Sequence, residues 1–304
     1  MLRLRILGAA AGGGFPQWNC GCPNCAAVRA GDGALEPRTQ DSVAVTSDGH
    51  SWVLLNASPD VLRQIEANPV LWPRTARDSP IAAIVLTNGD VDHVLGLFAL
   101  RESQPLAVYA TARVLDGLEQ NVLLRTLRRF SGHVEFRPLA IGQPVEIEGV
   151  DGASTGVVVE AFSAAGKPPI HLAAAFPPHL EDNVGLLLKG RTGGRAAYVT
   201  AARSAASVAD VVSGSSALLF DGTFFSEDEL PRLGLGTARA ADMAHVPIGG
   251  DDGSLTGLRD LRVERRIYTH VNNTNPILRR DSTERRLVES RGWEVAYDGM
   301  EIIV

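Results

Sequence analysis

A continuous apolar run that leads straight into a polar loop is the feature that most constrains the fold of this chain. Residues 81–87 have the length of a β-strand and show no polar alternation, as expected of a strand that is covered on both faces. The loop at residues 88–93 follows directly, and the apolar residues 94–100 predict a helix after it. The loop is therefore expected at the carboxyl end of a buried strand, where α/β folds place their chemistry.

Further short elements are expected along the whole chain. A hairpin signal at residues 47–50 joins the predicted strands 42–46 and 52–56, and Ser58 followed by Pro59 predicts the cap and first position of a helix. Other strands are predicted at residues 2–7, 106–109, 134–137, 157–161, 183–188, 196–200 and 217–221. This mixture predicts two sheets with helices outside them, in a single domain over residues 1–304.

Composition and charge exclude several classes of protein. With 304 residues, of which 45% are hydrophobic, the chain can bury a large core. The net charge of −6 and the absence of a long basic block argue against nucleic acid as a partner. No segment has the roughly 18 uninterrupted apolar residues that would span a bilayer, and the N-terminus lacks the apolar core of a signal peptide. We therefore expect a cytoplasmic protein with reduced thiols and no membrane partner, and leave a homodimer open.

All cysteines of the chain lie in the run Cys20-Gly21-Cys22-Pro23-Asn24-Cys25. Three thiols so close together converge on one metal ion more readily than on disulfides, and Zn²⁺ prefers four soft or imidazole ligands in a tetrahedron. A redox C-x-x-C is the alternative, but it would leave Cys20 spare and no thioredoxin-like pattern surrounds it. We predict a structural zinc site whose fourth ligand comes from elsewhere in the chain.

The loop after the buried strand holds Asp90, Asp92 and His93. Carboxylate and imidazole together suit Zn²⁺, Fe²⁺ or Mn²⁺ better than Ca²⁺ or Mg²⁺. The alternative is that one of the two aspartates caps the next helix while His93 merely packs nearby. A second predicted strand, at residues 266–269, ends in His270. If the two loops meet, Asp92, His93 and His270 would form the two-histidine, one-carboxylate face typical of non-haem Fe(II) sites.

Two more polar residues stand in loop contexts. His245 precedes a proline and a glycine pair and could donate a proton or orient a substrate, although a surface histidine is an equally good interpretation. Asp221 ends a predicted strand, and we expect an ordinary aspartate at a strand-to-loop junction there.

Eight segments of the chain, in this order, resemble the pyrroloquinoline quinone (PQQ) biosynthesis protein B family of the metallo-β-lactamase superfamily. They lie at residues 12–22, 38–42, 56–60, 87–93, 182–185, 221–224, 243–248 and 270–276. The runs G-F-P-Q-W-N-C-G-C and H-V-N-N-T-N-P are long enough to be specific. The resemblance implies an α/β fold of the metallo-β-lactamase type, an αββα sandwich of two mixed β-sheets flanked by helices, with the site at one edge between the sheets.

The resemblance also implies an altered metal site. The H-x-H-x-D-H motif of the superfamily aligns with residues 88–93, so Asn88 and Asp90 replace its first two histidines while Asp92 and His93 are retained. The final histidine of the superfamily matches His270. The middle histidine and the bridging aspartate find no counterpart at residues 163–167 and 198–202. A two-metal hydrolase site is therefore not expected, because about half of its ligands are missing.

A position close to His270 in the sequence bears on the fourth ligand of the predicted zinc site. In related phosphodiesterases of the superfamily, a histidine three residues after the final active-site histidine completes the cysteine zinc site. That position is Asn273 here, so Asn273 is the candidate for the fourth zinc ligand.

The function that the resemblance implies is the assembly of PQQ from a Glu-Tyr unit of a ribosomal peptide. We predict one active-site metal, Fe²⁺, held by Asp92, His93, His270 and also Asp90, in an oxygenase that hydroxylates the tyrosine ring of the precursor. His245 and Asn272 would contact the substrate or the metal ligands. Two alternatives stay open: a carrier for PQQ or its precursor, which needs no turnover, and a hydrolase that uses a single metal.

Overall fold

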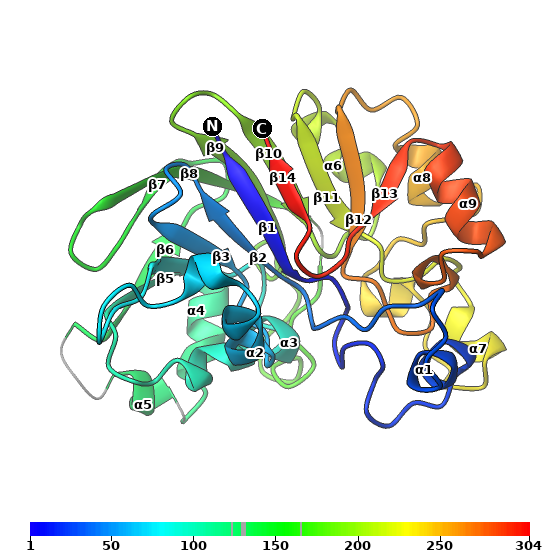
Figure 1. Ribbon diagram of the computed structural model, residues 1–304, viewed down its shortest axis with the longest axis horizontal. Helices are drawn as coiled ribbons and strands as arrows, with labels where there is room; N and C mark the ends of the chain where they lie inside the picture. The colour runs from blue at the N-terminus through cyan, green and yellow to red at the C-terminus, as the bar shows by residue number, and fades with distance from the viewer. Residues whose placement is uncertain (123, 129–131, 165) are drawn as a thin grey trace.

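Two seven-stranded mixed sheets form the centre of the molecule, and helices lie outside them (Figure 1). The computed structural model describes residues 1–122, 124–128, 132–164 and 166–304. The strand orders are β14-β1-β2-β3-β4-β5-β6 in the first sheet and β13-β12-β11-β10-β9-β8-β7 in the second. This arrangement confirms the αββα sandwich expected from the sequence.

The first sheet takes most of its strands from the N-terminal half of the chain. They are β1 (Arg3–Gly8), β2 (Ser42–Thr46), β3 (Trp52–Leu55), β4 (Ile81–Val85), β5 (Leu106–Thr111), β6 (Val134–Leu139) and β14 (Glu301–Ile303). Strands β3 to β6 run parallel, whereas β14, β1, β2 and β3 pair antiparallel. The associated helices are α1 (Pro23–Arg29), α2 (Val61–Glu66), α3 (Val91–Val94), α4 (Ala112–Glu119), α5 (Leu124–Leu127) and the 3-10 helices η1 (Pro69–Leu71) and η2 (Leu95–Ala99).

The second sheet takes most of its strands from the C-terminal half. Its strands are β7 (Pro144–Glu148), β8 (Ser154–Ser163), β9 (Val184–Gly190), β10 (Arg195–Val199), β11 (Ala217–Asp221), β12 (Arg265–Thr269) and β13 (Trp293–Val295). Strands β10 to β13 run parallel, and β7 to β10 pair antiparallel. The remaining helices are α6 (Ala206–Val212), α7 (Glu229–Arg232), α8 (Ser254–Gly257), α9 (Thr283–Ser290), η3 (Ala241–Met243) and η4 (Pro276–Leu278).

Three hydrophobic clusters hold these layers together. The cluster between the sheets contains Leu4 and Val53 from the first sheet and Val159 and Leu219 from the second, all fully buried. A second cluster lies under α2 to α5, and a third packs α6, α8 and α9 onto the other sheet and includes Cys25 of α1. Each apolar face is therefore covered, as two packed layers of secondary structure require.

The parallel strands bring the polar loops to one edge of the sandwich. Parallel neighbours end on the same side, so the residues after β4 in one sheet and after β11 and β12 in the other lie at matching edges. A bridge between Ala10 and Val271 ties the loop after β1 to the loop after β12, and the Ala11 N–H donates to the Val271 carbonyl over 3.0 Å. The two loops of the predicted site also meet, because Asp92 Oδ2 in the segment after β4 lies 3.3 Å from His270 Nε2 after β12.

Two predicted helix starts are wrong, for a local reason in each case. The helix expected from Ser58 begins at Val61, and the Ser58 hydroxyl accepts a hydrogen bond from the Asp60 N–H rather than capping a helix at Pro59. The helix expected from residue 94 begins at Val91, because the His93 and Val94 N–H groups already donate to the Asp90 carbonyl. The short strands β7, β13 and β14 are absent from the strands predicted from the sequence.

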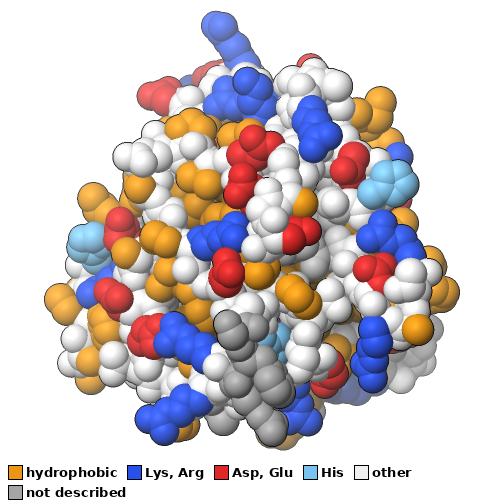
Figure 2. All heavy atoms as spheres, turned by 90° about the vertical axis from the view of Figure 1, so that its left-hand side faces the viewer, with side chains coloured by type: hydrophobic (Ala, Val, Ile, Leu, Met, Phe, Trp, Pro, Cys, Tyr) orange, Lys and Arg blue, Asp and Glu red, His pale blue; other side chains and the backbone are white. Residues whose placement is uncertain are grey.

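The surface and the helix lengths bear on possible partners. On the face shown in Figure 2, basic and acidic side chains of the described residues are interspersed and do not gather into a basic patch. Among the described residues, no helix has the length and hydrophobicity needed to cross a membrane.

Candidate functional site

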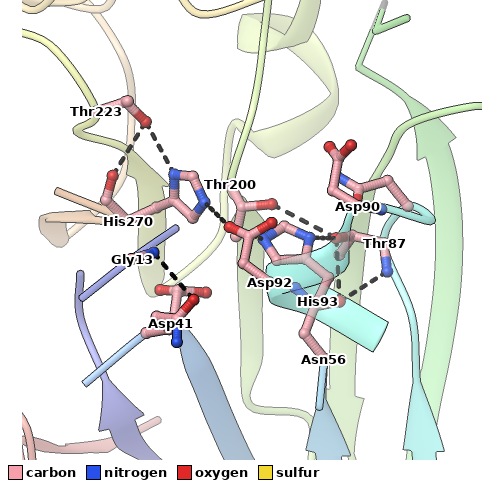
Figure 3. Close-up of polar contacts among 12 residues, drawn as sticks. Gly13, Asp41, Asn56, Thr87, Asp90, Asp92, His93, Thr200, Thr223 and His270 are labelled. Carbon is pink, nitrogen blue, oxygen red and sulfur yellow. Dashed lines mark hydrogen bonds and ion pairs between the residues drawn. The ribbon is translucent and has the colours of Figure 1, made fainter. Parts of the chain in front are cut away.

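Three predicted ligands meet at the edge between the sheets (Figure 3). The ligand atoms of Asp92, His93 and His270 all lie within 4.8 Å of one another, and we call this group the Asp92 site. Asp92 Oδ2 lies 3.3 Å from His270 Nε2 and 3.8 Å from His93 Nε2. The two imidazole rings meet edge to face at 5.3 Å between centroids. Helix α3 supplies the first two residues and the end of β12 supplies His270.

The orientation of His93 is set by a chain of hydrogen bonds that ends in an amide. Asn56 Oδ1 accepts from the Thr87 N–H at 2.9 Å and from the Thr87 hydroxyl at 3.1 Å. Since the hydroxyl proton is used there, Thr87 Oγ1 accepts from His93 Nδ1, which lies 3.2 Å away. The unprotonated Nε2 then faces Asp92, and this buried atom has no hydrogen-bond partner among the described residues. An orphaned imidazole nitrogen beside a carboxylate fits a metal ligand.

His270 is held in the same way from the other sheet. Thr223 Oγ1 donates to Asp221 Oδ1 at 2.7 Å, so it accepts from His270 Nδ1, at 2.9 Å. His270 Nε2 is thereby turned toward Asp92. The backbone of His270 is left-handed, with φ of 54°, a conformation that is uncommon for a residue other than glycine and is found at functional sites.

Charge and burial oppose each other in the Asp92 site. Burial favours a neutral Asp92, but the neighbouring His93 and His270 outweigh it and hold the pKa of the Asp92 carboxyl below its usual range. Burial likewise opposes a charged His270, yet the hydrogen bond and charge of Asp92 and the charges of Asp41 and Asp221 raise the pKa of His270 to about 9. Burial lowers the pKa of His93. Without metal, His270 therefore carries a proton that a metal ion must displace.

Asp90 stands apart from these three residues. Its side chain makes no capping hydrogen bond to α3, and its N–H donates to Asn88 Oδ1 at 3.0 Å. The carboxylate lines the cavity beside the Asp92 site but lies outside the group of ligand atoms, and Figure 3 shows it directed away from Asp92. Burial, followed by the charge of Asp92, raises its pKa. The structure thus brings together three of the four predicted ligands.

The predicted substrate contacts His245 and Asn272 both line this cavity, which has a volume of about 190 Å³. His245 stacks on His270 at 5.5 Å with 26° between the ring planes. Its Nδ1 lies 2.9 Å from Asp221 Oδ2. Asn272 Nδ2 donates to Thr274 Oγ1 at 2.6 Å, and its own N–H donates to the Thr223 carbonyl.

Asp221 is the residue that sequence reasoning undervalued. It is fully buried, and its two oxygens contact Thr223 and His245, so one carboxylate orients both His245 and, through Thr223, His270. The signal was present in the sequence. Asp221 is the last residue of β11, a parallel strand, just as the residues of the Asp92 site follow the parallel strands β4 and β12. Its ligand atoms also lie within 4.8 Å of those of His245 and His270.

The three thiols converge at the start of α1, and we call Cys20, Cys22 and Cys25 the cysteine site. The side-chain amide nitrogen of Asn273 lies 3.1, 3.6 and 3.4 Å from the Sγ atoms of Cys20, Cys22 and Cys25. The two ends of an amide are interchangeable in such an assignment, so the reversed amide would direct Oδ1 at the three sulfurs. Asn24 Nδ2 donates to the carbonyls of Asn273 and Asn275, which joins the cysteine loop to the loop after β12.

The chain has close relatives among known proteins. A protein of Methylobacterium sp. (strain 4-46) described as coenzyme PQQ synthesis protein B is 44% identical over 302 residues, which cover 98% of each protein. A protein of Bradyrhizobium diazoefficiens with the same description is 42% identical over 315 residues, and the match covers 100% of each protein. The chain belongs to the coenzyme PQQ synthesis protein B family. The β-lactamase superfamily domain matches residues 51–271 of this family member.

Solved structures agree with the assignment of this chain to the coenzyme PQQ synthesis protein B family. The 1.98-angstrom crystal structure of Zn(2+)-bound PqqB from Methylobacterium extorquens matches with a TM-score of 0.92 and 42% identity, over 99% of this chain and 100% of that one. A diphosphatase from the PhnP family matches with a TM-score of 0.67 at 19% identity, over 100% of this chain and 98% of that one, which shows a shared fold alone. The family resemblance read from the sequence is confirmed.

Proposed function

We propose that this protein acts in PQQ biosynthesis as a metal-dependent oxygenase that hydroxylates the tyrosine ring of a Glu-Tyr-derived precursor. The observation that carries the proposal is the Asp92 site. Two imidazoles and one carboxylate converge there, each imidazole with its Nδ1 engaged by a threonine and its Nε2 directed at the carboxylate. Three ligands on one side leave the other side open to the cavity, and this is the donor set of non-haem Fe(II) oxygenases.

Each residue has a part in this proposal. Asp92, His93 and His270 would hold the metal, and Asp90 would complete the set only by turning its carboxylate toward them. When bound, Fe²⁺ supplies the capacity to activate O₂ beside the substrate. His245, fixed through Nδ1 by Asp221, would offer its other ring nitrogen to the substrate as a proton donor or acceptor, and Asn272 would contact the substrate from the same wall.

The cysteine site fits a structural Zn²⁺ ion. Three sulfurs supply soft ligands, and the side chain of Asn273 occupies the remaining side of the group. The Zn²⁺-bound relative from Methylobacterium extorquens supports zinc in this family. Because burial raises the pKa of the Cys22 thiol to about 11, zinc would displace a proton there on binding.

The test is anaerobic reconstitution with Fe²⁺, followed by exposure to O₂ in the presence of a Glu-Tyr dipeptide and a two-electron reductant such as ascorbate, because insertion of one oxygen atom leaves the other to be reduced to water. We expect a product heavier by one oxygen atom from the wild-type protein and none from His93→Ala. Metal stoichiometry should show that the variant loses iron but keeps zinc. Tight binding of PQQ or Glu-Tyr with no change of mass would instead make the protein a carrier, and cleavage of a phosphodiester or lactam without O₂ would make it a hydrolase.

A further inference from the structure

The wall of the cavity beside the Asp92 site carries an uneven distribution of charge. Asp90, Asp92 and Lys167 all line it. Among the described residues that line this cavity, Lys167 is the one with a lysine or arginine side chain. Lysine is rare in this chain, whose 29 basic residues are arginines apart from Lys167 and Lys189.

The backbone that carries Lys167 is fixed against the loop after β4. A Cβ added to Gly166 would lie 2.2 Å from Asn183 Cβ, so only glycine permits this approach. One added to Gly89 would lie 3.0 Å from Pro169 Cγ, which shows how closely Pro169 packs on that loop. Asn88 Nδ2 in turn donates to Asn183 Oδ1 at 3.2 Å. Lys167 is therefore held beside the residues that carry the metal ligands Asp92 and His93.

The ammonium group of Lys167 can donate more hydrogen bonds than it makes to the described residues. Its Nζ donates to the backbone carbonyl of Asp242 at 2.9 Å, and a lysine has three N–H donors. The carboxylate of Asp242 is engaged by the Arg239 N–H at 2.9 Å. None of the ion pairs among the described residues includes Lys167, so its charge is neutralised by no carboxylate of the described chain. Such a cation at the wall of a cavity is suited to bind an anionic group.

We propose that Lys167 binds a carboxylate of the substrate and so sets the direction in which the substrate enters. The identity of the substrate rests on the proposed function, since a Glu-Tyr precursor carries both carboxylates and an aromatic ring. Asp90 and Asp92 repel a carboxylate from the metal ligands, while Lys167 attracts it to its own part of the cavity wall. The ring is then the part that is presented to the Asp92 site.

Binding measurements on the full-length, metal-loaded protein without O₂ test this proposal. The ligands are Glu-Tyr, Gln-Tyr and Glu-Tyr amide, so that each carboxylate is neutralised in turn. We expect Lys167→Met to weaken Glu-Tyr binding about 10- to 100-fold, the range of a charge-assisted hydrogen bond. Lys167→Arg should recover part of the loss. One neutral analogue should bind the wild-type protein as weakly as Glu-Tyr binds Lys167→Met, and should lose nothing further in that variant.

Lys189→Met is the matched control, because Lys189 is exposed on β9 and does not line this cavity. Equal affinities of Lys167→Met and Lys189→Met for all three ligands would overturn the proposal. If Glu-Tyr is oxygenated and KM is unchanged in Lys167→Met, Lys167 has no such role although the proposed chemistry stands. If Lys167-dependent binding occurs without any oxygenation, the chemistry fails and the role of Lys167 stands. A wild-type protein that binds none of the ligands overturns both.

Discussion

At the scale of single residues, the same device orients the two imidazoles of the Asp92 site. A threonine after β4, Thr87, engages His93, and a threonine after β11, Thr223, engages His270. Each threonine gives its own proton to a fixed acceptor, Asn56 or Asp221, so the imidazole donates through Nδ1 and turns its Nε2 toward Asp92. Residues behind the ligands therefore decide which nitrogen can bind a metal.

Removal of this orientation should weaken the metal site without unfolding the protein. We expect Thr223→Ala to lower the affinity for Fe²⁺ by about 10- to 100-fold, because His270 loses the acceptor for its Nδ1 proton. Thr223→Ser keeps the hydroxyl and should retain most of the affinity. Metal titration of both variants, with zinc content as an internal reference for the cysteine site, measures the effect. Equal iron affinity in wild type and Thr223→Ala would contradict it.

The charge state of His270 gives a dependence on pH. Its pKa is raised from the ordinary value near 6.5 to about 9, so the metal-free protein holds this proton at neutral pH and releases it as the pH rises through 9. Metal binding must displace the proton, so affinity should increase with pH up to about 9 and then level off. Calorimetry in buffers of different ionisation enthalpy would detect one proton released per metal ion at pH 7. Release of no proton would show that His270 is already neutral.

At the scale of elements, the cysteine site fastens the N-terminal loop to the loop after β12. Helix α1 begins directly after Cys22, and Asn273 lies three residues beyond His270, so the two candidate metal sites share one loop. The spacing of the cysteines predicted their convergence, because the ligands are local. The partner from residue 273 could be named only from a family resemblance, since no local pattern links positions some 250 residues apart.

Substitution of Asn273 tests its part in zinc binding. Asn273→His would supply an imidazole, a stronger zinc ligand than an amide, and should raise zinc affinity. Asn273→Ala should lower it and reduce the melting temperature, because the amide lies within 3.6 Å of all three sulfurs. Zinc release followed with a chromophoric chelator gives the order of affinities. Unchanged release from Asn273→Ala would remove Asn273 from the ligand set.

The start of α3 shows how a small change in an element alters a site. The apolar pattern predicted a helix from residue 94, with Asp92 and His93 in the loop before it. In the structure the Asp90 carbonyl accepts from His93 and Val94, so Asp92 and His93 occupy the first turn and Asp90 precedes it. That turn directs Asp92 toward His270 and leaves Asp90 at the cavity wall. Hydrophobic periodicity does not carry this information, because polar first turns look like loops.

At the scale of the whole molecule, the site depends on the packing of one sheet on the other. Asp92 and His93 follow a strand of the first sheet, whereas Asp221 and His270 come from the second. The fully buried cluster between the sheets, which includes Leu219 of β11, sets their separation. The distances within the Asp92 site are therefore a consequence of this core.

A cavity in this core should reduce both stability and metal binding. Leu219→Ala should destabilise the protein by about 2–5 kcal/mol, the usual range for a buried leucine. Leu235→Ala, at a position with 44% exposure, is the control and should change stability by less than about 0.5 kcal/mol. Chemical denaturation of the two variants gives the difference. A loss of less than about 1 kcal/mol in Leu219→Ala would show that the core relaxes to fill the space.

The sequence by itself determined two sheets with helices outside them, the two loops that carry Asp92, His93 and His270, and the cluster of cysteines, because periodicity, turn signals and local ligand spacing are written in consecutive residues. The αββα sandwich of the metallo-β-lactamase type followed from the family resemblance. Only the tertiary structure decided that Asp221 orients two histidines, that Asp90 stays outside the ligand group, that Asn273 faces the three sulfurs and that Lys167 shares the wall of the same cavity. These relations join residues from different sheets and loops. They arise when the two sheets pack, and no local pattern of the chain encodes the resulting distances.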